Sequence, residues 1–132
     1  MTNEQIVKVV RECVAEAIDA DVEEVQADHC IVKDLGADSI DLLDLLFQLE
    51  QKFNIRISPR GIEKQAQLEL GETPLEVDGV YTEEALVKLR EALPEISEGE
   101  LGLGLRTDEL PRLFRVSTFV NLVTNLKEHQ NA

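Results

Sequence analysis

The fold of this 132-residue chain is decided around one stretch, Asp34-Leu35-Gly36-Ala37-Asp38-Ser39-Ile40-Asp41. Gly36 is the natural turn point before a serine that stands between two acids. Asp38 and Asp41 have the spacing of the N-cap and N3 residues of a helix, so Asp38 can accept hydrogen bonds from the free backbone amides there. Ser39 would then have its hydroxyl turned outward. A helix N-terminus favours negative charge, so this serine is well placed to bear a covalently attached phosphate.

The helix predicted after this turn runs from Ser39 to about Phe53. Its apolar surface is too wide for a single interface. Some of these side chains must be enclosed on several sides or remain available to a ligand. They are Leu42, Leu43, Leu45, Leu46, Phe47, Leu49 and Phe53.

Two further helices are predicted near the ends of the chain. Thr2-Asn3-Glu4-Gln5 has the form of a capping box, and apolar residues recur after it at intervals of three and four, which predicts a helix over about residues 3–19. Ser117 is the expected cap of a last helix with Phe119 and Val123 on its apolar face. Residues 20–38 are expected to form a loop whose apolar side chains pin it to the core.

Residues 54–110 have a different character. Thr82-Glu83-Glu84 resembles a helix cap, and the apolar residues after it predict a helix that Pro94 ends. Leu101-Gly102-Leu103-Gly104-Leu105 alternates leucine with glycine, and we expect a loop there whose leucines are able to make apolar contacts.

The charge excludes some classes of function. The chain has 27 acidic and 13 basic residues, a net charge of −14. Nucleic-acid binding needs clustered Lys and Arg, so this balance argues against it and favours basic partners. Hydrophobic residues make up 43% of the chain and recur at helical spacing, which argues against disorder.

Nothing in the sequence supports catalysis by Ser39. A nucleophilic serine needs a base, and the two histidines, His29 and His129, lie in a loop and near the end of the chain. Neither has a second ligand at useful spacing, so no metal is expected. Cys13 and Cys30 have no CxxC spacing and are predicted to be buried thiols in a reducing compartment. With no signal peptide or membrane span in the sequence, the expected location is the cytoplasm.

Residues 28–41, followed by Leu43, Asp44, Leu45, Leu49, Glu50 and Phe53, resemble the acyl carrier proteins of fatty-acid and polyketide synthesis. The family signature D-S-L is Asp38-Ser39-Ile40 here, with Ile replacing Leu. The resemblance is dense over residues 2–57 and looser over 111–127, and residues 58–110 depart from the family altogether.

The resemblance implies that Ser39 carries covalent 4′-phosphopantetheine and that acyl groups ride on its thiol as thioesters. The protein would be a carrier and not an enzyme. The implied fold is all-α, an acyl-carrier-like four-helix bundle of three main helices and a short one, with a helix-containing insertion between the second and last helices. Residues 1–132 would form a single acyl carrier domain, with 58–110 as an inserted subregion.

The resemblance also assigns surface and interior roles. Partner enzymes would recognise acidic and exposed apolar positions of the second helix, where Phe47 is larger than usual for the family. These positions are Asp38, Ile40, Asp41, Asp44, Phe47 and Glu50. The acyl chain would lie against Leu43, Leu46, Leu49 and Val116.

The implied partners are a phosphopantetheinyl transferase and acyl ligases, ketosynthases or acyltransferases with basic patches, acting on a monomer. Two alternatives remain open: a peptidyl or aryl carrier of nonribosomal synthesis, and an unmodified acidic interaction module with the same fold. Residues 58–110 could serve as a docking site for dedicated enzymes, as a cap over apolar surface, or as a lid over an unusual acyl chain.

Overall fold

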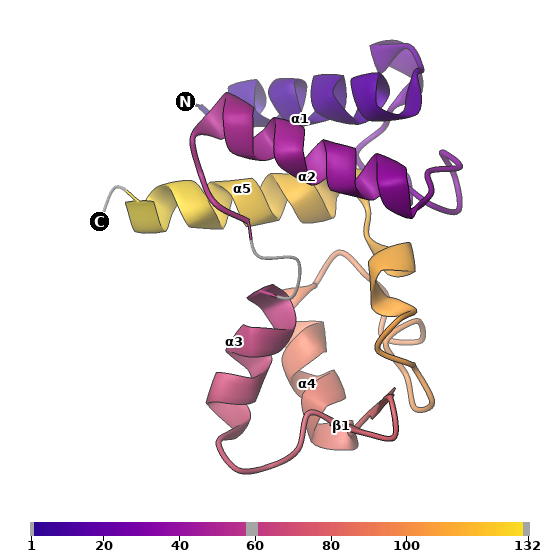
Figure 1. Cartoon of the computed structure of the whole chain (residues 1–132), viewed down its shortest axis with the longest axis vertical. Coiled ribbons are helices and arrows are strands. Elements are labelled where there is room, and N and C mark those ends of the chain that lie inside the picture. Colours follow the sequence, from indigo (N-terminus) through magenta and orange to yellow (C-terminus); the bar gives the residue numbers. More distant parts are fainter. Residues whose placement is uncertain (1, 58–60, 131–132) are drawn as a thin grey trace. The chain divides into compact units, whose positions relative to one another are not determined.

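The computed structural model describes residues 2–57 and 61–130. Its elements are α1 (Asn3–Ile18), a 3₁₀ turn η1 (Val22–Glu24), α2 (Ser39–Phe53), α3 (Gly61–Leu70), β1 (Glu76–Val77), β2 (Val80–Tyr81), α4 (Glu83–Ala92), a second 3₁₀ turn η2 (Leu110–Leu113) and α5 (Val116–Gln130) (Figure 1). The fold is helical apart from the two-residue strands, which confirms the predicted class.

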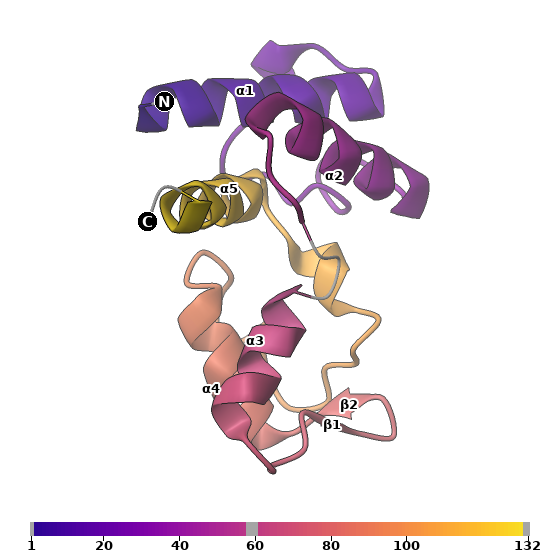
Figure 2. The same cartoon turned by 60° about the vertical axis from the view of Figure 1, so that its left-hand side comes forward.

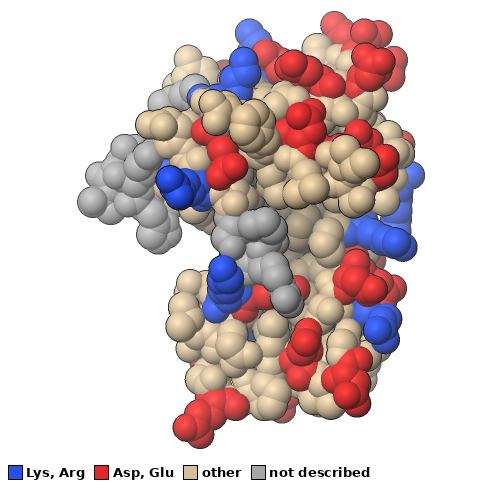
Figure 3. Space-filling model, in the orientation of Figure 1, with Lys and Arg blue, Asp and Glu red and all other residues tan. Residues whose placement is uncertain are grey.

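The chain divides into two compact units. Unit 1 consists of Met1–Ile57 and Phe114–Ala132, and unit 2 is Ser58–Leu113. Unit 2 therefore includes the whole predicted subregion 58–110. Acidic residues outnumber basic ones about two to one in each unit, fourteen against seven in unit 1 and thirteen against six in unit 2. Acidic side chains accordingly lie on both units in the face that Figure 3 shows.

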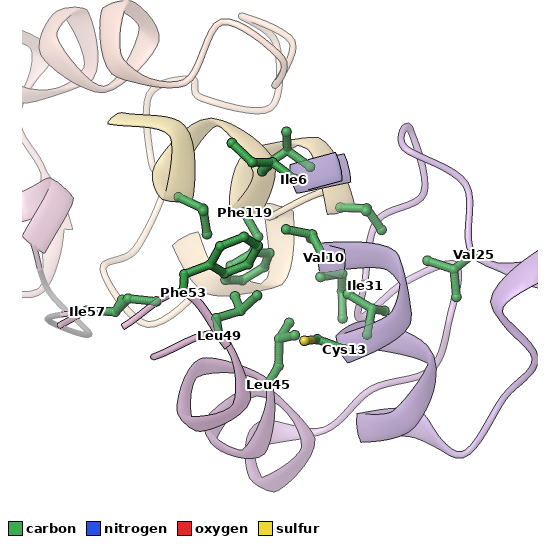
Figure 4. Packing of buried hydrophobic residues seen from close by; sticks show 14 of the residues in the cluster. Ile6, Val10, Cys13, Val25, Ile31, Leu45, Leu49, Phe53, Ile57 and Phe119 are labelled. Atoms are coloured by element: carbon green, nitrogen blue, oxygen red, sulfur yellow. The ribbon is translucent and has the colours of Figure 1, made fainter. Parts of the chain in front are cut away.

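In unit 1, α1, α2 and α5 pack around one aliphatic core. The helices α2 and α5 begin at the end of the unit where the α1–α2 loop lies, and α1 begins at the opposite end (Figure 1). Leu45 points toward Cys13 of α1 in this core (Figure 4). The other buried members of the cluster are Ile6, Val10, Val14, Ala15, Val25, Ile31, Ala37, Leu49, Phe53, Ile55, Ile57, Val116, Phe119, Val120 and Val123.

The sequence predicts the boundaries of α1 and α2 closely. The Thr2 and Gln5 side chains form the expected capping box, with Gln5 N 3.2 Å from Thr2 Oγ1. The α1–α2 loop is pinned as predicted by buried Val25 and Ile31. The Arg11 guanidinium also holds this loop, by donating to the carbonyl oxygens of Val22 and Val25. The spacing of apolar residues does not predict this contact.

The start of α5 corrects the prediction that Ser117 caps this helix. Ser117 lies inside α5, which begins at Val116. The hydroxyl oxygen of Thr118 instead accepts from the backbone amide of Arg115 at 2.9 Å. The helix begins before Ser117 because the backbone amides of Val116 and Ser117 donate to the carbonyl oxygens of His29 and Ala27, and this pairing fixes where α5 starts.

Unit 2 packs α3 against α4 and adds a small hairpin (Figure 2). The predicted α4 forms, and the Thr82 hydroxyl caps it by accepting from Ala85 N at 3.2 Å. The predicted loop over residues 101–105 also forms, with Leu101 and Leu105 buried and Leu103 exposed. The remaining buried apolar residues of this unit are Ala66, Leu75, Tyr81, Ala85, Leu86, Leu89, Leu93, Ile96, Leu110 and Leu113.

Two elements of unit 2 are absent from the predictions. The helix α3 is rich in Glu, Gln and Lys, and its buried positions are Glu63 and Ala66, so it has little apolar periodicity. The Tyr81 hydroxyl donates to the carboxylate of Glu63, which supplies the polar partner that a buried carboxylate needs. The hairpin turns at Asp78 and Gly79, both at positive φ, the two-residue turn that an Asp-Gly pair favours.

The core of unit 1 gives a matched test on one helix. We expect Leu49→Ala to lower the free energy of unfolding by about 2–5 kcal/mol, because it leaves a cavity in a closed core. Leu43→Ala changes the same residue type on the same helix, but its side chain is 61% exposed, so the expected loss is under about 1 kcal/mol. Chemical denaturation followed by circular dichroism measures both, and equal losses would contradict this packing.

Candidate functional site

The site is built at the N-terminus of α2. Asp38 Oδ1 accepts from Asp41 N at 2.8 Å, and Asp41 Oδ2 accepts from Asp38 N at 3.1 Å. This reciprocal capping box starts the helix at Ser39, as the sequence predicts. Ser39 is exposed, and Gly36 makes the preceding turn at φ +74°. The serine therefore stands in solvent at the positive end of a 15-residue helix.

The first turn of α2 fits a phosphate ester on Ser39. The capping box uses the amide of Asp41, whereas the amides of Ser39 and Ile40 have no acceptor among the described residues. Free first-turn amides and the helix dipole both stabilise a phosphate placed there.

The loop before Ser39 is fixed to the start of α5. Ile31 N donates to Phe114 O at 3.1 Å and Val116 N donates to His29 O at 3.0 Å, on either side of an antiparallel bridge between Cys30 and Arg115. The Asp34 carboxylate accepts from Cys30 N at 2.7 Å and tightens the same loop. The contacts between the loop and the start of α5 join residues that are more than 80 positions apart in the sequence.

An apolar stripe follows Ser39 on the outer face of α2. Ile40, Leu43 and Phe47 are 73%, 61% and 60% exposed and have i, i+3 and i+7 spacing. The exposed acids Asp38 and Asp44 flank them. We call this surface the α2 stripe.

The structure gives the remaining predicted recognition residues a second role. Asp41 is half-buried and belongs to the capping box. Glu50 is also half-buried, and its carboxylate accepts from Ile57 N at 3.0 Å, which holds the segment after α2.

The predicted acyl-pocket residues fall into two groups. Leu49 and Val116 are fully buried in the core of unit 1, and Leu46 packs against it half-buried. Leu43 instead lies on the α2 stripe. Leu43 follows Ile40 by three residues and precedes Phe47 by four, and this helical spacing in the sequence indicates that the three side chains share one face.

The remaining titratable candidates whose side chains the structure describes have local surroundings of their own. His29 is half-buried, and its Nδ1 accepts from Gln26 N at 3.1 Å, which occupies that ring nitrogen. The side chain of His129 lies outside the described residues. Cys13 and Cys30 are buried thiols, as predicted.

Burial raises the pKa of the Cys13 thiol from 9.0 to about 11. The charge of Lys52 lowers it and those of Glu16 and Glu12 raise it further. Cys13 is therefore a packing residue and not a nucleophile.

These features define a class of protein. A serine exposed at a capped helix N-terminus, beside an acidic and apolar surface, is suited to carry a phosphate-linked group and present it to other proteins. Among the described residues, no helix is long and apolar enough to cross a membrane.

Comparisons with known proteins identify the family. A family model described as "Phosphopantetheine attachment site" matches residues 8–69. The acyl carrier protein of Exiguobacterium sp. is 44% identical over 66 residues, which cover 50% of this chain and 84% of that protein. That of Wolinella succinogenes is 44% identical over 57 residues (43% and 75%), and that of Cyanidium caldarium is 41% identical over 64 residues (48% and 74%). No solved structure matches.

The chain belongs to the acyl carrier protein family. Its members are carriers and not enzymes, and their cofactor is covalent 4′-phosphopantetheine. The family match ends at residue 69, inside α3, so it does not include α5, which the structure nevertheless packs against α1 and α2.

The raised pKa of Cys13 predicts slow alkylation in the folded protein. At pH 8.5 its thiolate should be roughly a hundredfold rarer than that of an ordinary thiol, because the pKa is two units higher. We expect iodoacetamide, followed by peptide mass spectrometry, to label Cys13 far faster in urea than in buffer. Equal rates in both would contradict the burial of this thiol.

The same shift predicts a loss of stability in alkali. Between about pH 9 and pH 11 the unfolded thiol ionises while the folded thiol keeps its proton, so ionisation favours unfolding as the pH rises. The Cys13→Ala protein should lack this part of the pH dependence, whatever its stability at neutral pH.

Proposed function

We propose that Ser39 carries the 4′-phosphopantetheine arm, and that the chain tethers acyl intermediates as thioesters and presents them to enzymes of lipid or polyketide biosynthesis. The observation that carries this proposal is the exposure of Ser39 at the first residue of capped α2, inside the range that the family model matches. The bound arm supplies a thiol for thioester formation.

The residues around Ser39 support attachment there. Asp38 and Asp41 satisfy each other's backbone amides, so the helix begins at Ser39, whose side chain is exposed to a modifying enzyme. The amides of Ser39 and Ile40 can stabilise the phosphate charge without a basic side chain.

We assign enzyme docking to the α2 stripe. Ile40, Leu43 and Phe47 offer apolar contact area, and Asp38 and Asp44 offer negative charge that would steer basic patches on a phosphopantetheinyl transferase, acyl ligase, ketosynthase or acyltransferase. Asp41 and Glu50 add charge at its edges, since each is half-exposed. Aromatic residues such as Phe47 are enriched in the cores of protein interfaces.

We assign the acyl chain to the interior of unit 1. Leu46, Leu49 and Val116 lie in or against its core, and a carrier must shield a hydrocarbon chain from water between enzymes. We also propose that the protein works in the cytoplasm, which its two buried thiols support.

The attachment site is tested by intact mass. Incubation of the unmodified protein with coenzyme A and a broad-specificity transferase should add the mass of one phosphopantetheine. Ser39→Ala should abolish the increase, because it removes the attacking oxygen.

The matched control is Ser97→Ala, which removes an exposed serine of unit 2 and should be modified fully. An unchanged mass of the folded wild-type protein, or a full increase in the Ser39→Ala protein, would overturn this assignment.

The docking surface is tested by the kinetics of the same transferase. We expect Phe47→Ala to lower kcat/KM about fivefold or more, through lost apolar contact. Asp44→Lys should lower it most at low salt, because an exposed charge acts mainly on encounter. Glu12→Lys makes the same charge change on an exposed position of α1 and should have little effect. Equal effects of Asp44→Lys and Glu12→Lys would argue against this surface.

A further inference from the structure

Gln48, on α2, has a buried amide oxygen without a partner. Its Nε2 donates to Asp44 Oδ2 at 2.9 Å, one turn earlier on the helix. Its Oε1 is buried, and among the described residues it finds no hydrogen-bond donor. The oxygen is the only buried side-chain N or O atom of that kind in the described part of the chain.

The orientation of this amide is dictated by chemistry. The Asp44 carboxylate can only accept, so the NH₂ group of Gln48 must face it. Turning the amide over would set oxygen against oxygen at hydrogen-bond distance. The carbonyl oxygen is therefore the atom that points away from solvent.

The buried oxygen lies on the flank of α2 that faces α1. Leu45, Gln48 and Lys52 form one row of the helix, at i, i+3 and i+7. Leu45 points toward Cys13 of α1 (Figure 4), and the charge of Lys52 acts on the same thiol. Gln48 stands between them in that row, at the edge of the space between the two helices.

A buried carbonyl oxygen without a donor is unfavourable, and nearly all such groups in folded proteins have a partner. An apolar side chain would fill the same position without this penalty. The side chain therefore fits a state of the protein in which a donor reaches it.

We propose that Gln48 Oε1 accepts a hydrogen bond from the attached group, either from an amide of the phosphopantetheine arm or from a hydroxyl of its cargo, and that in the second case the carrier favours hydroxyacyl groups over plain hydrocarbon chains. This inference rests on the attachment at Ser39 proposed above. Ser39 is nine residues before Gln48, about 13 Å along the helix at 1.5 Å per residue, which an extended arm with an acyl group can span. The two sources of a donor are the amides of the arm and a hydroxyl of the acyl chain.

The test compares thermal unfolding of protein loaded with a saturated acyl chain and with its 3-hydroxy counterpart of the same length. In the wild type, a cargo hydroxyl that reaches Gln48 should make the hydroxyacyl form melt roughly 4 °C higher, whereas an arm amide that reaches it should raise both loaded forms equally above the protein without an arm. Gln48→Leu should remove either effect, and Gln51→Leu, which changes an exposed glutamine of the same helix, should keep it. Without an arm, the Gln48→Leu protein should melt at the same temperature as the wild type or higher, because it lacks the buried acceptor.

A comparison of protein without the arm, with the arm alone and with each acyl group shows whether the donor belongs to the arm or to the acyl chain. A stabilisation that depends on Gln48 and appears as soon as the arm is attached, equal for both cargoes, assigns the donor to the arm. One that appears with the hydroxyacyl group alone assigns it to the cargo.

Two results would overturn the inference while leaving the carrier function intact. In the first, mass spectrometry confirms that the arm and the acyl group are attached, but Gln48→Leu does not change the melting temperature of any loaded form. The other is a fall in melting temperature for Gln48→Leu that is as large without the arm as with it, since that indicates a partner within the protein. A protein that accepts no arm at all overturns both proposals, and its unchanged mass reveals this before any melting experiment.

Discussion

The structure depends on the pairing of two short backbone segments, residues 27–31 and 114–117. Three backbone hydrogen bonds hold them: Ile31 N to Phe114 O, Val116 N to His29 O, and Ser117 N to Ala27 O, the first two of which form the antiparallel bridge between Cys30 and Arg115. They place the start of α5 beside the loop that leads to Ser39, and the buried face of α5 then completes the core that α1 and α2 begin. The cost of closing a chain grows slowly with the length between its ends, so an insertion as long as unit 2 can be tolerated here.

This arrangement separates the fixed and the available parts of the site. Buried Leu45, Leu49 and Phe53 hold one face of α2, and its capping box fixes where the helix begins. The opposite face keeps Ile40, Leu43 and Phe47 in solvent, which is costly for apolar side chains unless they are used in contacts. In the function proposed above, this one helix would provide the attachment point, the docking surface and part of the interior.

The sequence predicts the elements whose local signals agree with their burial. Capping residues and apolar spacing give α1, α2 and α4 almost to their boundaries. The same reasoning misses α3, because its buried positions include Glu63 and its stability depends on Tyr81, a contact that no local pattern reveals. It misplaces the cap of α5 because distant pairing sets the register. At the site, it predicts Ser39 at the capped start of α2. It does not anticipate the unpaired oxygen of Gln48, since burial of a single atom depends on the packed fold.

The central claim is that Ser39 is the attachment point of the arm, and locating the modification in protein isolated from its native cell tests it most directly. Peptide fragmentation by mass spectrometry should find phosphopantetheine, with or without an acyl group, on Ser39. If every peptide that contains Ser39 is unmodified, or if the arm is found on another residue, the result would contradict this assignment.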